Sequence, residues 1–291
     1  MTQMNAAEAS ELFRGAPHQM IDVGEGRVAH RKVGTGPDVL FVHGWPVSGA
    51  TFRTLLPHLV EHVTCHLIDL PGAGSSEFGP DTVITVEQHF QSIRRVVDAL
   101  GADEIAVVGH DSGGLMARHA LAGDSRVRAM ALINTETSGA ISFRFRSFIA
   151  SRHVPGFGRV LGWLAGKPSL RRNRFVLGDA FADSSLLDGE FDEFFLRPLH
   201  EEPARLAAAM KLLDSFELRH IKELADVHGR INVPVKMVWG DKDPFFPLRD
   251  AQAMVGTFSN ATLDVIEGAG LFSHEESPDR VAASLLEVIA S

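Results

Sequence analysis

The sequence predicts an α/β fold in which a mostly parallel, eight-stranded sheet carries helices on both faces and one helical insertion. Short β-branched or apolar runs alternate with helix-forming stretches over most of the chain, and this alternation lapses only between about Thr135 and Arg230. Strands that alternate with helices build a parallel sheet covered on both faces. With 291 residues, 45% of them hydrophobic, the chain can bury one large core. We therefore expect a core of 1–134 and 231–291, with a helical cap at 135–230.

The strand pattern begins with a hairpin. Runs 18–23 and 27–33 are strand-like and are joined at Gly24-Glu25-Gly26, a glycine-rich turn signal. The next run, 38–42, is continuously apolar, as expected for a strand that is buried on both faces. The remaining expected strands are 63–69, 105–110, 127–133, 235–239 and 261–266.

Helices are predicted between these strands. Residues 50–61 have a helical pattern, and 86–100 carry an apolar stripe at the spacing of an amphipathic helix. A further helix follows the fifth strand to about residue 123, and a closing helix is expected at 279–290. The insertion is mostly helical in pattern, and it is basic over 144–174 and acidic over 179–202.

Composition excludes several functions. The net charge of −9 argues against nucleic acid as a partner. No run approaches the roughly 20 apolar residues that span a bilayer, and no basic start precedes an apolar stretch, so we expect a cytoplasmic protein without a membrane partner. The single cysteine, Cys65, excludes an intrachain disulfide and is expected to be a buried strand residue. We expect no metal and no cofactor, and a homodimer stays open.

The most informative stretch is the junction between the fifth strand and its helix, at Gly109-His110-Asp111-Ser112-Gly113. A strand that turns sharply into a helix lifts one side chain out of the sheet, and the residues two before and two after it must lack a β-carbon. Gly109 and Gly113 bracket Asp111 in this way. If Ser112 were the raised residue, His110 would fill a position that is too crowded for it. We therefore expect Asp111 to be raised.

These residues resemble the α/β-hydrolase superfamily, and specifically its branch with an aspartate nucleophile and a helical cap, which includes epoxide hydrolases and haloalkane and fluoroacetate dehalogenases. The resemblance covers nearly the whole chain, from residue 18 to residue 290. Four motifs carry it by their order and spacing: His43-Gly44-Trp45-Pro46, the elbow at Asp111, Gly240-Asp241-Lys242-Asp243, and the segment 270–278.

The resemblance implies a role for each motif. Asp111 would attack carbon and form an ester with the enzyme, which water activated by a histidine then hydrolyses. Asp243 would orient that histidine, although an aspartate here can also be a simple turn residue; Glu136 is an alternative acid. Backbone N–H groups of Trp45 and Ser112 would face the charge that develops on the ester oxygen.

The sequence departs from the family at the histidine. Counted back from Pro278, the family position is occupied by Leu271, which cannot take a proton from water. His274 lies three residues further on. If a helix begins near Phe272, the side chains of residues 271 and 274 lie on one face, and His274 reaches the site. The alternative is that His274 is a histidine at a helix start, paired with Glu275 or with solvent.

Three further departures concern the substrate. The chain has no tyrosine, whereas epoxide hydrolases typically open the ring with cap tyrosines. Ser112 stands where haloalkane dehalogenases typically have a tryptophan and fluoroacetate dehalogenases an arginine. In the cap, the candidates for donors to a substrate are Arg144, Arg146, His153 and Trp163. Leu271, Phe272 and Phe245, together with Trp163, are the expected pocket residues.

The sequence therefore predicts a hydrolase that acts through an aspartyl ester on a small, mostly apolar molecule, at a carbon–halogen, epoxide or ester bond. One alternative is a binding protein or pseudoenzyme that keeps the pocket without turnover. Another is an esterase or lactonase in which Ser112 attacks.

Overall fold

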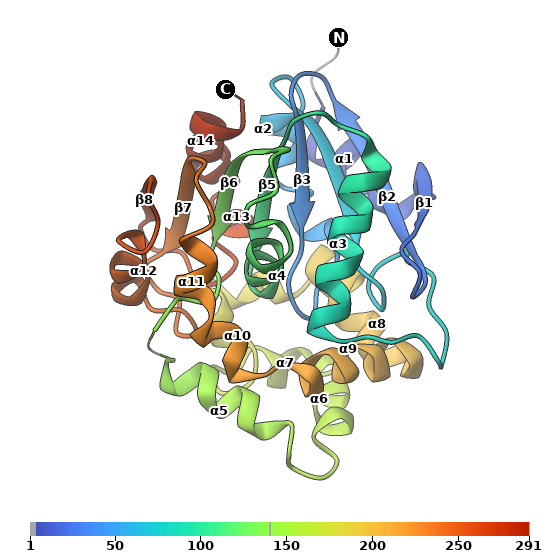
Figure 1. The fold of residues 1–291 in the computed structure, drawn as a ribbon. Helices are drawn as coiled ribbons and strands as arrows, with labels where there is room; N and C mark the ends of the chain where they lie inside the picture. The colour runs from blue at the N-terminus through green and yellow to red at the C-terminus, as the bar shows by residue number, and fades with distance from the viewer. Residues whose placement is uncertain (1–3, 140, 291) are drawn as a thin grey trace.

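The computed structural model describes residues 4–139 and 141–290, and in them eight strands form one sheet (Figure 1). The strand order is β1-β2-β4-β3-β5-β6-β7-β8. Strand β2 runs antiparallel to β1 and β4, and every other neighbouring pair is parallel, so the predicted mostly parallel, eight-stranded sheet is confirmed. The strands are β1 (Gln19–Asp22), β2 (Arg27–Gly34), β3 (Asp38–Val42), β4 (Thr64–Asp69), β5 (Ile105–His110), β6 (Val127–Ile133), β7 (Val235–Gly240) and β8 (Ala261–Ile266).

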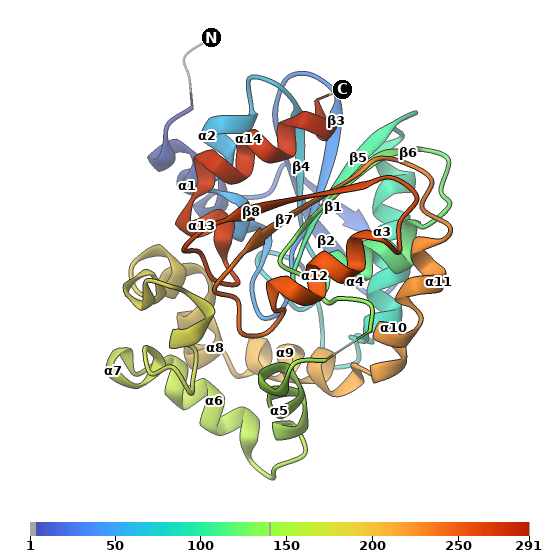
Figure 2. The same ribbon diagram turned by 90° about the vertical axis from the view of Figure 1, so that its left-hand side faces the viewer.

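Helices cover both faces of this sheet. Helices α3 (Val86–Leu100), α4 (Ser112–Leu121) and α11 (Leu224–His228) lie on one face, and α1 (Ala6–Arg14), α2 (Leu56–Leu59) and α14 (Pro278–Ile289) lie on the other (Figures 1 and 2). Helix α12 (Leu248–Val255) packs against β7 and β8. Every residue of β4, β5 and β7 is buried, as expected for strands enclosed by two helical layers.

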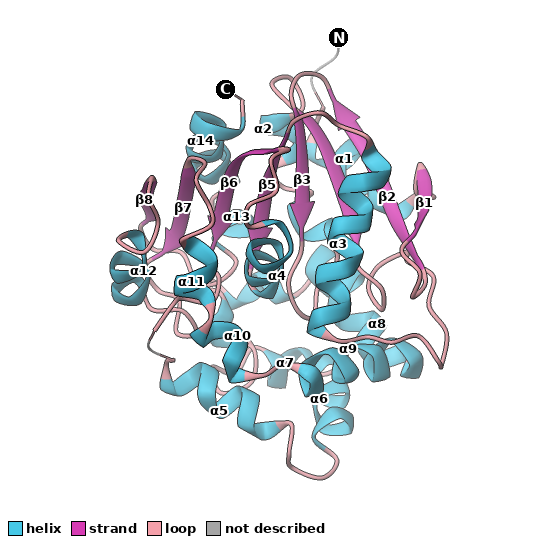
Figure 3. Ribbon diagram, viewed as in Figure 1, coloured by secondary structure: helices cyan, strands magenta, loops and turns pink. Residues whose placement is uncertain are grey.

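The chain between β6 and β7 is helical and lies across the carboxyl edge of the parallel strands (Figure 3). Its α-helices are α5 (Phe143–Ser151), α6 (Phe157–Ala165), α7 (Pro168–Arg171), α8 (Arg197–Glu201), α9 (Pro203–Ser215), α10 (Leu218–Lys222) and α11. Three short 3₁₀ or π turns, Gly178–Ala180, Ser184–Leu187 and Asp192–Leu196, join them. Because α11 contacts α4, the end of this segment belongs to the layer that covers the sheet. Among the described helices, none has the length and apolarity to span a membrane.

One predicted helix is shorter in the structure. Residues 50–61 form a 3₁₀ turn, Gly49–Phe52, and the single-turn helix α2 in place of a continuous helix. Pro57 explains the break, because it has no N–H for the preceding turn and is tolerated only in the first turn of a helix, where α2 places it.

The turn between β5 and α4 has the conformation that its glycines predict. Asp111 has φ 51° and ψ −137°, and it is one of two residues other than glycine with positive φ in the described chain. A β-carbon on Gly109 would lie 2.5 Å from the Cα atom of Gly114, and one on Gly113 would lie 2.3 Å from the carbonyl oxygen of Val42. The backbones of β3, β5 and α4 therefore meet at van der Waals contact below Asp111.

This packing predicts that Gly113→Ala lowers the free energy of unfolding by about 3 kcal/mol, because the added methyl group collides with backbone atoms that cannot move independently. Gly79→Ala is the matched control. A β-carbon at Gly79 would have no neighbouring atom within 4 Å, so we expect a change within about 1 kcal/mol. Urea unfolding of both variants measures the difference, and equal effects would contradict the tight elbow.

Candidate active site

The Asp111 carboxylate lies at the start of α4, where two backbone N–H groups face it. The N–H of Trp45 donates to Oδ2 at 2.8 Å, and the backbone N–H of Ser112 also donates to this carboxylate. The side chain packs on Gly44, where a β-carbon would lie 2.4 Å from Oδ2, and the residue is 8% exposed. The helix start adds a favourable field for a negative charge. The structure thus brings Asp111, Trp45 and Ser112 together.

Asp111 contributes to an apolar cavity between the sheet edge and the cap. The cavity comprises about 820 Å³ of space free of atoms, part of it open to solvent. Its polar side chains are those of Asp111, Ser112 and Glu136. The other lining residues are Trp45, Pro46, Val86, Met116, Phe145, Phe148, Ile149, Val176, Leu177, Ala180, Leu212, Leu213, Phe216, Phe245, Phe246, Leu271 and Phe272. Of the residues expected in the pocket, Leu271, Phe272 and Phe245 line it.

Glu136 follows β6 and faces the same cavity. The residue is 1% exposed, and burial raises the pKa of its carboxyl group. Burial and the neighbouring charge of Glu136 also raise the pKa of Asp111 well above its usual value, whereas the N–H groups of Ser112 and Trp45 act in the opposite direction. Two carboxyl groups in one apolar cavity repel each other when both are ionised, so they titrate as a pair.

A buried network connects the two carboxyl groups. The Thr135 hydroxyl lies 2.7 Å from the backbone oxygen of Asp111 and 3.0 Å from Oε2 of Glu136. Arg118 is fully buried on α4, and its Nη2 donates to the Thr135 hydroxyl at 3.0 Å and to the backbone oxygen of Glu136 at 2.7 Å. The turns after β5 and β6 are therefore held to each other and to α4.

Asp243 is buried beside this site, and its hydrogen bonds are satisfied without an imidazole. Its Oδ1 accepts the backbone N–H groups of Phe245 and Phe246 at 2.8 and 3.0 Å, and its Oδ2 accepts Asn134 Nδ2 at 2.9 Å. Burial raises the pKa of Asp243 to about 7, against the effect of these donors. The charge of Asp243 also raises the pKa of Asp111.

The structure places His274 in the core and leaves it out of the cavity wall. His274 is fully buried, its Nε2 lies 2.8 Å from the Thr51 hydroxyl, and its ring packs against His110 with centroids 4.4 Å apart. Burial lowers its pKa well below the usual value. The expected shared face of residues 271 and 274 requires a helix from Phe272, but Phe272 has φ −93° and ψ 49°, and the helical turn begins at Ser273.

As a result, Leu271 faces the cavity while His274 faces away, and no histidine is among the described residues that line the cavity. The alternative pairing of His274 with Glu275 or solvent is also not seen, because Glu275 binds Arg53 at 2.7 Å and His274 has no exposed surface.

The cap candidates lie outside the cavity wall. Trp163 is 51% exposed on α6, so its expected place in the pocket is not what the structure shows. Arg144 forms an ion pair with Asp179 at 2.7 Å. Arg146 and His153 are exposed. The basic and acidic halves of the cap thus neutralise each other at least in part, as the Arg144 pair illustrates.

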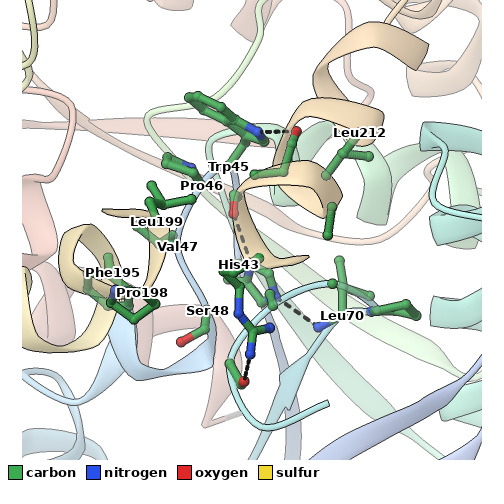
Figure 4. Close-up of a pocket in the computed structure, with 18 of the residues that line it drawn as sticks. His43, Trp45, Pro46, Val47, Ser48, Leu70, Phe195, Pro198, Leu199 and Leu212 are labelled. Atoms are coloured by element: carbon green, nitrogen blue, oxygen red, sulfur yellow. Dashed lines mark hydrogen bonds between the residues drawn. The ribbon is translucent and has the colours of Figure 1, made fainter. Parts of the chain in front are cut away.

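A second cavity lies on the other side of Trp45 and Pro46, between the sheet edge and α8 and α9 (Figure 4). His43 lines it, but both ring nitrogens of His43 are engaged: Nδ1 lies 2.9 Å from the Gly44 oxygen and Nε2 accepts the Leu70 N–H at 2.9 Å. The indole N–H of Trp45 donates to the Ala209 oxygen at 2.8 Å and ties this wall to the cap. Neither Asp111 nor Glu136 lines this cavity.

The motifs of the sequence indicate Glu136 only as an alternative acid, and they do not identify Thr135 or Arg118. The positions of these residues in the chain nevertheless indicate that they lie near Asp111. Residues 134–136 directly follow the strand beside the elbow strand, and the ends of adjacent parallel strands meet at the same edge of a sheet.

Comparisons with known proteins agree with this architecture. Residues 37–278 match the family described as alpha/beta hydrolase fold. The chain is 28% identical to haloalkane dehalogenase 2 of Mycobacterium tuberculosis, over 91% of this chain and 92% of that protein. It is also 28% identical to the pimeloyl-[acyl-carrier protein] methyl ester esterase of Xanthomonas campestris pv. campestris, over 89% of this chain and 97% of that protein.

Among solved structures, the epoxide hydrolase CorEH without ligand superposes with a TM-score of 0.77 at 21% identity, over 94% of this chain and 98% of that one. This likeness concerns the fold. Together with the family match over most of the sequence, it identifies the chain as a member of the α/β-hydrolase fold family.

Proposed function

We propose that this protein is a hydrolase that acts on a small, mostly apolar molecule through an ester of Asp111. The observation that carries the proposal is the position of the Asp111 carboxylate. It lines an apolar cavity and accepts hydrogen bonds from the backbone N–H groups of Trp45 and Ser112. A carboxylate fixed in this way is oriented for attack on a carbon atom in the cavity.

The N–H groups serve both halves of the reaction. In the first half, an oxygen of Asp111 bonds to a substrate carbon and the leaving group departs with the electron pair of the broken bond. In the second half, water adds to the ester carbonyl, and negative charge develops on the carbonyl oxygen. Donors that are already in place beside that oxygen stabilise the charge without reorganisation.

The cavity wall indicates the substrate class. Apart from Asp111, Ser112 and Glu136, its side chains are apolar or aromatic, so they favour an uncharged organic molecule. The relatives include a haloalkane dehalogenase and a methyl ester esterase, and the fold superposes on that of an epoxide hydrolase. The cleaved bond is accordingly of the carbon–halogen, epoxide or ester type.

Two observations support competing functions. Ser112 Oγ lies 3.5 Å from Oδ2 of Asp111, which would suit a serine nucleophile, but no histidine among the described wall residues is available to deprotonate it. Leu271 in the place of the family histidine favours a binding protein without turnover. A single labelling experiment separates these functions from the proposed one.

We predict that incubation with a panel of alkyl halides, epoxides and esters in heavy-oxygen water modifies Asp111. Mass spectrometry of the digested protein should find either the substrate mass added to the Asp111 peptide or heavy oxygen in its carboxylate. Asp111→Ala should abolish activity and labelling, whereas Ser112→Ala should retain both. Modification of Ser112 would instead establish a serine esterase, and an unlabelled protein with every compound would establish a binding protein.

A second prediction concerns the missing base. Leu271→His places an imidazole in the cavity wall, on the loop that follows β8, and it should speed hydrolysis of the Asp111 ester by about 100-fold or more. Leu271→Asn is the control of similar size without a base. Rapid quench and intact-mass measurement of ester decay decide the outcome; a histidine variant no faster than the asparagine variant would refute the assignment of this position.

A further inference from the structure

We propose that Glu136 is the acid–base group of this site: it protonates the leaving oxygen when Asp111 opens an epoxide, and it then takes a proton from the water that attacks the ester. This inference rests on the proposed Asp111 ester and adds to it a catalytic residue and a substrate class.

The composition of the cavity points to Glu136 first. Among the described residues that line the cavity, Asp111 and Glu136 are the ones with acid or base side chains. The chain has no tyrosine, and its described histidines lie outside this wall. Once Asp111 is consumed as an ester, Glu136 is the wall side chain that can exchange a proton with a substrate or with water.

Glu136 is not saturated by an ion pair. The guanidinium of Arg118 has five N–H groups. They donate to the backbone oxygens of Gly114 and Glu136, to the Thr135 hydroxyl, to His228 Nε2 and to the sulfur of Met254. Within the described chain, none of them is directed to the carboxylate of Glu136. Arg118 thus supplies a buried positive charge near this carboxyl group without occupying its oxygens.

The hydrogen bonds of Thr135 accommodate a proton on Glu136. A threonine hydroxyl has one proton to donate and two lone pairs to accept with. That proton can serve only one of two acceptors, the backbone oxygen of Asp111 at 2.7 Å or Oε2 of Glu136 at 3.0 Å, while one lone pair accepts from Arg118. When the backbone oxygen of Asp111 takes the proton, the remaining lone pair of the hydroxyl faces Oε2 and is satisfied by a proton on Glu136.

The charges of the site agree with this placement. Burial raises the pKa of both carboxyl groups, and the charge of Glu136 raises the pKa of Asp111 further, so a single proton on the pair relieves the repulsion between them. With one proton, Asp111, Glu136 and Arg118 sum to zero charge. Asp111 accepts two backbone N–H groups, which favour its ionised form, so in the proposed state the proton lies on Glu136. There burial must outweigh Arg118, Thr135 and the residue's own backbone N–H, which lower the pKa of that carboxyl group.

This protonation state suits the opening of an epoxide. Asp111 donates an electron pair to a ring carbon, the carbon–oxygen bond breaks, and its electron pair passes to the ring oxygen. That oxygen takes the proton of Glu136 and becomes a hydroxyl group. The products of this half are a neutral hydroxyalkyl ester of Asp111 and an ionised Glu136.

Ester formation also prepares Glu136 for the second half. It removes the negative charge of Asp111, so the repulsion that kept the proton on the pair is gone. Ionised Glu136 then takes a proton from water as the oxygen of that water bonds to the ester carbonyl carbon. Collapse of the intermediate breaks the bond between the carbonyl carbon and the alkoxide oxygen. The departing alkoxide takes the second proton of the added water, and Asp111 is released as a carboxylate. Epoxide plus water gives a diol, and Glu136 keeps the proton that it took from water.

Ester formation from an alkyl halide does not require a proton from Glu136. A halide ion leaves with its electron pair and needs no proton, so protonated Glu136 gives no help to that step. Glu136 then releases its proton to solvent, because the charge of Asp111 that held it is gone, and acts as the base for ester decay as before. The arrangement therefore favours substrates whose leaving atom is an oxygen.

The test compares Glu136→Gln with the unsubstituted chain, using styrene oxide and 1-bromo-2-phenylethane as probes and rapid quench with intact-mass detection of the Asp111 ester. Glutamine keeps the size of the side chain and an N–H donor toward Thr135, so the network stays intact. We expect ester formation from styrene oxide to slow by about 100-fold or more and from the bromide to change by less than about threefold. Ester decay should slow by about 100-fold with either probe.

Two further variants complete the experiment. Glu136→Asp should recover part of both rates, because it restores a carboxyl group, and Glu202→Gln, in the wall of the second cavity, should leave all rates unchanged. Equal slowing of ester formation with both probes, or unaltered ester decay, would overturn the role of Glu136 while leaving the Asp111 ester intact. Absence of any Asp111 ester in the unsubstituted chain would overturn the proposed function and this inference with it.

Discussion

The site depends on one interaction, the binding of the Asp111 carboxylate by the backbone N–H groups of Trp45 and Ser112. An ionised carboxylate is costly to bury in an apolar cavity unless donors replace its water. Trp45 and Ser112 provide those donors from the loops after β3 and β5, which are adjacent strands. The parallel pairing of these two strands thus places both donors beside the carboxylate and favours its charged form.

The same strand order explains why Glu136 is a neighbour of Asp111. Strand β6 pairs with β5 on the side opposite to β3, so the residues after β6 meet the elbow from the other direction. Buried hydrogen bonds of Thr135 and Arg118 hold the two turns together. The distance between the two carboxyl groups is therefore set by the backbone of the sheet and of α4. Proton exchange between such groups is sensitive to small changes in position, and a rigid support limits those changes.

The sheet and the elbow could be predicted from the sequence because they depend on local patterns. Apolar runs between turn signals indicate the eight strands, and the glycine spacing around residue 111 indicates the raised residue. The placement of His274 could not be predicted in this way. It depends on whether a helix begins at residue 272 or 273, and one residue changes the direction of a helical side chain by about 100°. The exposure of Trp163 depends on cap packing, which has no comparable local signal.

With Leu271 in the cavity wall, the β7 and β8 side of the site has no acid or base side chain among the described residues that line the cavity. By its resemblance to the family, Asp243 is expected to orient a histidine at residue 271, yet its oxygens already accept hydrogen bonds from Asn134 and from the backbone of residues 245 and 246. The loss of an imidazole therefore leaves no unsatisfied carboxylate behind and no reason for the loop to rearrange. On the opposite side of Asp111, the carboxyl group of Glu136 faces the cavity. In the proposed mechanism, proton transfer accordingly takes place at the edge formed by β5 and β6, and the edge formed by β7 and β8 contributes the apolar wall residues.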